Sequence, residues 1–202
     1  DFIFIYIYIY MIILLGMPKS GTSSFHELFT KLGYKSYHWK KGNQYIGKMI
    51  ENNKKNKKPL LCDFLDSDVI TQMDVCINKD KCYWPQIVDY KQIINENQNS
   101  IFILNKRNPE ELLSSFKRWR HLYKRLFTYN PDIFTDKTDK GFIEFVNNFY
   151  SKIELYFEEN QNLKFISYDI NNDKIEKLEK YINIQKISTF PKVNVNKKKL
   201  GI

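Results

Sequence analysis

The chain has 202 residues and a formal net charge of +9 at pH 7. Its length fits one domain with a substantial core, and 43% hydrophobic and 16% aromatic content excludes an intrinsically disordered chain. The positive charge suits an anionic cofactor, although nucleic acid or an acidic membrane surface would suit it as well. We predict a single domain over residues 1–202, with residues 1–10 as an upstream extension of the first strand.

Residues 1–15, DFIFIYIYIYMIILL, form the most apolar segment of the chain. The run is short of the ~20 residues that a membrane-spanning helix needs. It begins with Asp1 and lacks the basic region of a signal peptide. Its end must also supply the strand that leads into the loop described next. We therefore expect a core strand and no membrane span, in a soluble cytoplasmic protein, with Met11 as a candidate start.

The stretch from Met11 to Leu32 has three parts. Residues 11–15 are a continuous apolar run rich in β-branched residues, as in a fully buried strand. Residues 16–23, GMPKSGTS, are a turn of small residues with one lysine. Apolar residues then recur at helical spacing, at Phe25, Leu28, Phe29 and Leu32. The expected order is therefore strand, glycine-containing loop and helix.

A loop between a strand and a helix N-terminus can bind an anion. The first N–H groups of a helix have no backbone acceptors, and the helix dipole adds roughly half a positive charge at that end. Gly21 lets the backbone approach a ligand, Lys19 adds a full charge, and Thr22 and Ser23 add hydroxyl donors. Phosphate or sulfate is the expected ligand.

The loop differs from that of nucleotide triphosphatases, whose pattern is G-x-x-x-x-G-K-[ST]. Gly16 and Gly21 have the required separation, but Thr22 stands where that pattern has lysine. Lys19 lies two residues before Gly21 instead, so it would approach the loop from the other side. A lysine that reaches a γ-phosphate in the usual way is therefore missing from this motif.

Later segments alternate between expected strands and helices. The expected strands are residues 34–39, 60–65, 100–105 and 163–167. The expected helices are residues 42–53, 85–97, 109–127, 140–159 and 174–182, with residues 66–82 unassigned. This alternation favours a three-layer α/β fold, in which helices cover both faces of a central parallel sheet of about five strands. Ligands of such sheets bind at the carboxyl ends of the strands, where we expect Lys19, His38, Asp63 and Arg107.

A second phosphate site is indicated by residues 103–119, ILNKRNPEELLSSFKRW. Arg107 leaves the expected strand, and Ser115 lies eight residues later, two turns into the expected helix. A guanidinium and a hydroxyl that converge there can hold a phosphate. Each residue has an ordinary alternative, as a surface cation and as a small helix residue. Taken alone, this motif leaves the phosphate site and these ordinary alternatives equally open.

The segment PKSGTSS, residues 18–24, resembles the 5'-phosphosulfate loop of sulfotransferases, which use 3'-phosphoadenosine 5'-phosphosulfate (PAPS). The pair of Arg107 and Ser115 resembles the family's 3'-phosphate site, and GYKSYHW (33–39) and FPKVNVNK (190–197) resemble further segments of one branch. The resemblance implies a P-loop-like fold, with Lys19 at the phosphosulfate bridge. It implies a loop around the 5'-phosphate formed by Pro18, Ser20, Gly21, Thr22 and Ser23.

One departure from the family concerns adenine. Cytosolic members have a tryptophan directly after this loop that stacks on the base, and this chain has Ser24 there. Adenine stacking must therefore come from elsewhere in the chain, or be weaker.

Sulfuryl transfer needs a base for the proton of the acceptor. His38 has a pKa suited to that role near neutral pH and matches the family's aromatic-His position; the alternative is a structural histidine between Tyr37 and Trp39. Asp63 is the rival base, because it ends the expected third strand and a nearby cation could keep it ionised. The sequence leaves the choice between His38 and Asp63 open.

The three cysteines, Cys62, Cys76 and Cys82, have no metal-ligand spacing, and no metal is expected. Three cysteines in a chain of this length suggest reduced thiols in a cytoplasmic setting. A disulfide between Cys76 and Cys82 stays open as the alternative.

The leading functional hypothesis is a PAPS-dependent sulfotransferase that acts on a hydroxyl or amine and releases adenosine 3',5'-bisphosphate. The first alternative is a P-loop nucleotide kinase-like phosphotransferase, which the missing Walker lysine disfavours. The second is a non-catalytic nucleotide-binding protein with the same fold. A small molecule or a carbohydrate is the expected acceptor and nucleic acid is not an expected partner, while the sequence leaves the acceptor's identity and the oligomeric state open.

Overall fold

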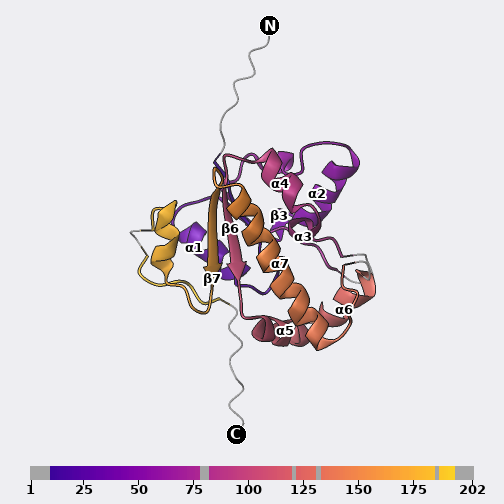
Figure 1. Ribbon diagram of the computed structural model, residues 1–202. Coiled ribbons are helices and arrows are strands. Elements are labelled where there is room, and N and C mark those ends of the chain that lie inside the picture. Colours follow the sequence, from indigo (N-terminus) through magenta and orange to yellow (C-terminus); the bar gives the residue numbers. More distant parts are fainter. Residues whose placement is uncertain (1–9, 78–81, 120–121, 131–132, 185–186, 194–202) are drawn as a thin grey trace.

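The computed structural model describes residues 10–77, 82–119, 122–130, 133–184 and 187–193 (Figure 1). The strands in these ranges are β1 (Ile12–Leu14), β2 (Ser36–His38), β3 (Lys40–Lys41), β4 (Gln44–Tyr45), β5 (Val69–Gln72), β6 (Ile101–Lys106) and β7 (Lys164–Asp169). They form a sheet in the order β4-β3-β2-β5-β1-β6-β7. The strands from β2 to β7 in this order are parallel, and the β3–β4 hairpin adds an antiparallel edge. The predicted α/β fold with a five-stranded parallel sheet is confirmed.

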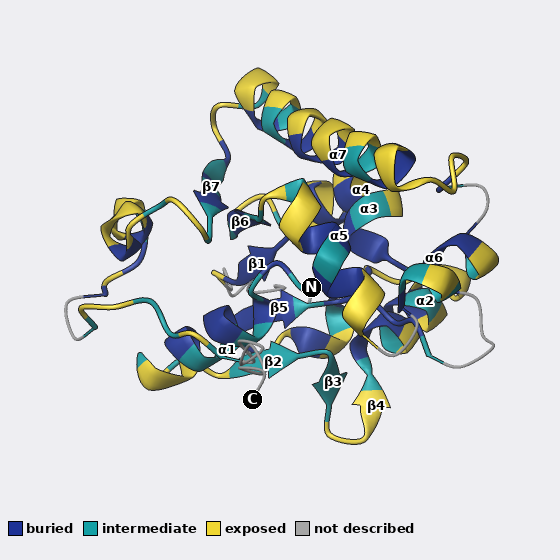
Figure 2. Cartoon of the chain, turned by 90° about the horizontal axis from the view of Figure 1, so that it is seen from below, coloured by how far each residue is buried: buried dark blue, intermediate teal, exposed yellow. Residues whose placement is uncertain are grey.

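Helices cover both faces of this sheet. They are α1 (Thr22–Lys31), α2 (Ile46–Lys55), α3 (Pro85–Val88), α4 (Tyr90–Glu96), α5 (Pro109–Arg118), α6 (Leu122–Tyr129) and α7 (Asp139–Glu159), with the 3-10 helices η1 (Cys62–Phe64) and η2 (Ile175–Lys180). Helices α1 and η2 pack on one face, whereas α2 to α7 pack on the other. Figure 2 shows α1 on one side of β1 and β5, with α5 and α7 on the opposite side.

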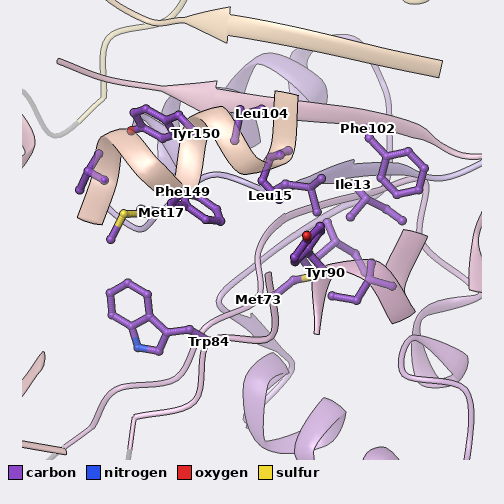
Figure 3. Packing of buried hydrophobic residues seen from close by; sticks show 14 of the residues in the cluster. Ile13, Leu15, Met17, Met73, Trp84, Tyr90, Phe102, Leu104, Phe149 and Tyr150 are labelled. Atoms are coloured by element: carbon purple, nitrogen blue, oxygen red, sulfur yellow. The ribbon is translucent and has the colours of Figure 1, made fainter. Parts of the chain in front are cut away.

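The centre of the five parallel strands is β1, which bonds to β5 on one side and to β6 on the other. All of its residues are buried, because its side chains alternate between two faces that are both covered by helices. Ile13 and Leu15 join the larger apolar cluster, which α7 covers (Figure 3), whereas Ile12 and Leu14 pack with Phe25 of α1. A strand without a solvent face explains the continuous apolar run in the sequence.

The expected strand over residues 60–65 is wrong. This segment contains η1, and the parallel sheet takes its third strand, β5, from the stretch that the sequence left unassigned. Leu60, Leu61 and Phe64 are buried in the core, so the segment is as apolar as a strand although its backbone turns. Asp63 consequently does not end a strand.

Three expected helices have different bounds in the structure. Helix α2 begins only at Ile46, because the preceding residues form the β3–β4 hairpin. The expected helix 85–97 divides into α3 and α4 at Asp89. The expected helix 109–127 divides into α5 and α6, since Trp119 has an extended backbone with φ −97° and ψ 99°. This division matters for function because it places Trp119 in the cleft described below.

Cys76 and Cys82 are joined by a disulfide, and Cys62 is free. The expectation of three reduced thiols is therefore wrong, and the alternative Cys76–Cys82 bond holds. Beside the disulfide, Val75 and Tyr83 exchange backbone hydrogen bonds of 2.9 and 2.8 Å. The segment that follows β5 is thereby tied to the start of α3.

Two expectations fall partly outside the described residues: the N-terminal extension at residues 1–10, of which only residue 10 is described, and the end of the FPKVNVNK segment at residues 194–197. Over the ranges that are described, no helix is both long enough and apolar enough to cross a membrane.

Candidate active site

The loop between β1 and α1 owes its shape to two left-handed residues and one asparagine. Lys19 and Gly21 have φ angles of 71° and 78°, a conformation that is common for glycine and rare for lysine. Asn105 of β6 accepts a hydrogen bond from the Gly16 N–H at 2.9 Å and donates one to the Ser20 carbonyl at 2.9 Å. Both contacts are buried, so Asn105 fixes the loop at both ends.

Cations converge on this loop. The Lys19 ammonium lies 4.0 Å from the centre of the Trp119 ring. Burial lowers the Lys19 pKa, and the positive charges of Arg107 and Arg118 lower it further. Arg107 Nη1 also donates to the Lys19 carbonyl at 3.1 Å. Because like charges held this close disfavour one another, an anion bound among them would be stabilised.

Arg107 and Ser115 come to the same cleft from β6 and α5. Arg107 directly follows β6, and its N–H donates to the Tyr150 hydroxyl at 3.2 Å. Its guanidinium pairs with Glu111 at 3.3 Å, a partly exposed contact of the kind that stabilises a fold little. Ser115 is buried on the cleft wall. A phosphate could take the place of Glu111 as the partner of this guanidinium.

The cleft has a volume of ≈ 1410 Å³ and lies at the carboxyl edge of the parallel strands. The predicted site residues that line it are Pro18, Lys19, Gly21, Thr22, Ser23, His38, Arg107 and Ser115. Ser20 is fully buried within the loop. Asp63 is not among the described residues that line the cleft, and its carboxylate accepts a hydrogen bond from Asn53 Nδ2 at 2.9 Å. The geometric argument that made Asp63 a rival base no longer holds.

His38, at the end of β2, contacts the hydroxyls of the loop. Its Nε2 lies 3.2 Å from Thr22 Oγ1 and 3.4 Å from Ser23 Oγ, and its ring stacks on His26 with the centroids 5.5 Å apart. Burial, followed by the charge of His26, lowers the His38 pKa to about 4. The ring is therefore neutral at pH 7, which suits a hydrogen-bonding partner better than a strong base.

Several cleft residues were not predicted from the sequence. They are Gln72, Asp74, Arg118, Trp119, Arg125, Tyr168, Ile170 and Phe190, and Asn105 acts from beneath the loop. A signal was available for the first two, since they follow the β-branched run of residues 69–71, but the misplaced strand at 60–65 concealed it. Asn105 gave no signal, because its role depends on contacts with residues 85 and 89 positions away.

Ser24, which stands where the resembling family has tryptophan, contacts the C-terminal part of the chain. Its hydroxyl accepts a hydrogen bond from the Val193 N–H at 3.1 Å. Phe190 packs edge-on against Phe25 at 4.8 Å and stacks on Tyr168 at 5.4 Å between ring centroids. Residues 187–193 thus lie across the start of α1 and bring an aromatic ring to the cleft.

Comparison with known families agrees with this geometry. The family model described as a sulfotransferase domain matches residues 11–190, from the first residue before β1 to Phe190. The chain belongs to the sulfotransferase domain family. No curated protein matches the chain. The matched range includes the loop after β1, the end of β6 and the whole parallel sheet.

Proposed function

We propose that this sulfotransferase-domain protein transfers a sulfuryl group from PAPS to a hydroxyl or amine acceptor. The observation that carries the proposal is that residues of both predicted phosphate motifs line one cleft. The loop after β1 presents Lys19 and the start of α1, and the end of β6 presents Arg107 opposite Ser115 on α5. PAPS carries anionic groups at two positions of one nucleoside, so a ligand of this kind would engage both subsites together.

The donor set fits such a ligand. The N–H groups at the start of α1 and the hydroxyls of Thr22 and Ser23 suit the 5'-phosphosulfate, and Lys19 suits the oxygen that bridges sulfur and phosphorus. Arg107 and Ser115 suit the 3'-phosphate. When bound, PAPS supplies an activated sulfuryl group, and adenosine 3',5'-bisphosphate is what the cleft holds after transfer. Catalysis by the protein then consists of positioning and of charge stabilisation at the loop.

We assign the adenine to the side of the cleft formed by Ile170 and Phe190. Ser24 cannot stack on a base, whereas Phe190 lines the cleft and is held by Phe25 and Tyr168. Ile170 lies next to the loop, since its Cγ2 would be 3.2 Å from a Cβ at Gly21. An aromatic face beside an aliphatic side chain supplies the apolar contact that a purine ring needs.

We further propose that this domain acts on a small-molecule or carbohydrate acceptor and works without a metal ion. The described part of the chain holds no group of three or more His, Cys, Asp or Glu side chains arranged to bind a metal. The cationic side chains of Lys19, Arg107 and Arg118 take the place that Mg²⁺ has in phosphotransferases, as neutralisers of charge on the bound nucleotide.

The test combines binding with turnover. Adenosine 3',5'-bisphosphate should raise the melting temperature, because a ligand that binds only the folded state stabilises it, and ATP with Mg²⁺ should raise it much less. Transfer of labelled sulfate from PAPS is then measured on a panel of sugars, phenols, amines and tyrosine peptides. Equal stabilisation by ATP would favour a kinase-like phosphotransferase, and tight bisphosphate binding without any transfer would favour a non-catalytic nucleotide-binding protein.

A further inference from the structure

Asp74 is a carboxyl group of the cleft that none of the sequence motifs includes. It lies two residues beyond β5, the strand between β1 and β2, and so at the same sheet edge as the loop. It lines the cleft although only 4% of its surface is exposed. Carboxylates are seldom buried without a charged partner, and this one sits in the part of the cleft that also contains His38 and Gln72.

A chain of hydrogen bonds connects Asp74 with Thr22, at the end of the loop between β1 and α1, which we call the anion loop. The Thr22 hydroxyl donates to Gln72 Oε1 at 2.9 Å, and Gln72 Nε2 donates to Asp74 Oδ2 at 3.3 Å. When Asp74 is ionised, its carboxylate can only accept and therefore orients the Gln72 amide. Asp74 Oδ1, by contrast, has no hydrogen-bond partner among the described residues. The Oδ1 atom is itself buried, and the Gln86 side chain lies close enough to lower the Asp74 pKa.

The same chain decides what His38 can do. Because the Thr22 proton is directed to Gln72, the hydrogen bond between Thr22 Oγ1 and His38 Nε2 has to be donated by the imidazole. The Nε2 atom then carries a proton and cannot accept one. His38 is accordingly placed to orient Thr22, and the nitrogen that faces the loop is not a free base.

The surroundings of Asp74 disfavour its ionised form, so the carboxyl changes its ionisation near physiological pH. Burial raises the Asp74 pKa to about 7, against smaller opposing effects of Gln72 and Gln86. The ionisable groups on the neighbouring elements are His38 on β2, Lys19 on the loop after β1 and Arg125 on α6, and none of them bonds to this carboxyl within the described chain. A carboxyl whose pKa lies near the working pH is suited to take up a proton in a reaction.

We propose that Asp74 is the general base of the reaction and that its carboxylate receives the proton of the acceptor hydroxyl or amine. This inference rests on the proposed sulfotransferase function. In the step, the acceptor oxygen or nitrogen forms a bond to sulfur, and the bond from sulfur to the bridging oxygen breaks. The electron pair of that bond stays on the departing phosphate, whose charge Lys19 stabilises, and the acceptor proton moves to Asp74.

The decisive variant is Asp74→Asn, which keeps the shape of the side chain and its contact with Gln72 but removes the base. The kcat for labelled sulfate transfer should fall by about 10²-fold or more, the size of a lost general base. The Kd for adenosine 3',5'-bisphosphate should not change comparably. In the unmodified protein kcat should rise with pH through about 7. Asp89→Asn is the matched control, because Asp89 is a buried carboxylate bonded to Tyr83 and Lys54 outside the cleft.

The outcomes separate this inference from the proposed function. Failure of the unmodified protein to bind the bisphosphate, or to sulfate any acceptor, would overturn the function itself. Bisphosphate binding together with full activity of Asp74→Asn would overturn only the role of Asp74. Loss of the pH dependence in His38→Gln, with the dependence intact in Asp74→Asn, would assign the base to His38 instead.

A second measurement needs neither cofactor nor acceptor. Because the folded-state pKa of Asp74 is raised above the unfolded value of about 3.9, the folded protein holds an extra proton between those two values. Its stability must therefore decrease as pH rises from about 4 through about 7. The Asp74→Asn variant lacks this loss, so the difference between its free energy of unfolding and that of the unmodified protein should shift in its favour as pH rises from about 4 to about 7. Parallel pH profiles of the two proteins would overturn the inference.

Discussion

Asn105 and Gly16 are in direct contact: the Gly16 N–H donates to Asn105 Oδ1 at 2.9 Å, and a Cβ on residue 16 would lie 2.3 Å from the same oxygen. The side chain at the end of β6 thus occupies the space that any residue other than glycine would need at the end of β1. Since Asn105 also binds the Ser20 carbonyl, the curvature of the anion loop is set by the neighbouring strand as much as by the loop's own sequence.

Replacement of Asn105 by alanine should consequently weaken bisphosphate binding as well as stability. It leaves the buried Gly16 N–H and Ser20 carbonyl without partners, at a cost of about 1–3 kcal/mol for each group. Asn130→Ala is the matched control, because Asn130 is a buried asparagine whose Nδ2 donates to Leu126, away from the loop. The control should lower the free energy of unfolding but leave the bisphosphate Kd unchanged, as measured by calorimetry. Equal effects of both variants on Kd would deny Asn105 a role in the loop.

The second subsite is tested by Arg107→Ala. The variant should weaken adenosine 3',5'-bisphosphate by roughly 2–4 kcal/mol, as expected when a charge-assisted partner is removed. It should barely affect adenosine 5'-phosphosulfate, which lacks the 3'-phosphate. Lys106→Ala serves as control, since the neighbouring cation pairs with Glu154 at 2.6 Å and does not reach the cleft lining. A similar loss for both nucleotides would mean that Arg107 supports the loop through its bond to Lys19 and does not recognise the 3'-phosphate.

The parts of this molecule that could be predicted depend on interactions between residues close in the sequence, whereas the parts that could not be predicted depend on packing between distant segments. The strand, loop and helix at residues 11–32 could be predicted because each is encoded locally, by an apolar run, by glycines and by helical spacing. The third strand could not, since residues 60–65 and 69–72 are both apolar, and only packing decides that the first segment turns and the second enters the sheet.

That single misplacement changed the candidate site. With the strand at residues 60–65, Asp63 became the acidic residue at the sheet edge; with β5 at Val69–Gln72, the acid there is Asp74. His38 was placed correctly at the end of its strand, but the sequence could not show which of its ring nitrogens carries the proton. The tautomer of His38 follows from Thr22 and Gln72, which lie 16 residues back and 34 residues on in the sequence.

His38 should also leave a signature in the pH dependence of stability. Its folded-state pKa of about 4 lies below the unfolded value of about 6.5, so the unfolded chain takes up a proton first as the pH falls. Stability is therefore lost between about pH 6.5 and about pH 4, in the opposite sense to Asp74. In His38→Gln this acid-side loss should be smaller, as measured by urea unfolding at several pH values. An unchanged acid-side slope would place the titrating group elsewhere, with His26, whose pKa burial also lowers, as the first alternative.

The last prediction concerns Lys19, whose ammonium rests on the Trp119 ring. As the bond from sulfur to the bridging oxygen breaks, negative charge grows on that oxygen, and a cation placed there acts more on the transition state than on the bound cofactor. Its loss should therefore appear mainly in kcat. Lys19→Met keeps the length and most of the volume of the side chain but removes its charge. We expect kcat to fall by roughly 10²–10³-fold, the effect of losing one preorganised charge-stabilising group.

The bisphosphate Kd of Lys19→Met should change much less, because the N–H groups at the start of α1 and the guanidinium of Arg107 still contact the anion. Lys19→Arg should restore activity only in part, since a planar guanidinium does not fit a site shaped for a point charge. Trp119→Leu distinguishes the contribution of the ring from that of the charge. It removes the cation–π contact at 4.0 Å but leaves the Lys19 ammonium, so it should reduce kcat less than Lys19→Met does. If kcat is unchanged in Lys19→Met while the bisphosphate still binds, the lysine takes no part in the chemistry, and the loop is a phosphate cradle whose catalytic charge must come from Arg107 or Arg118.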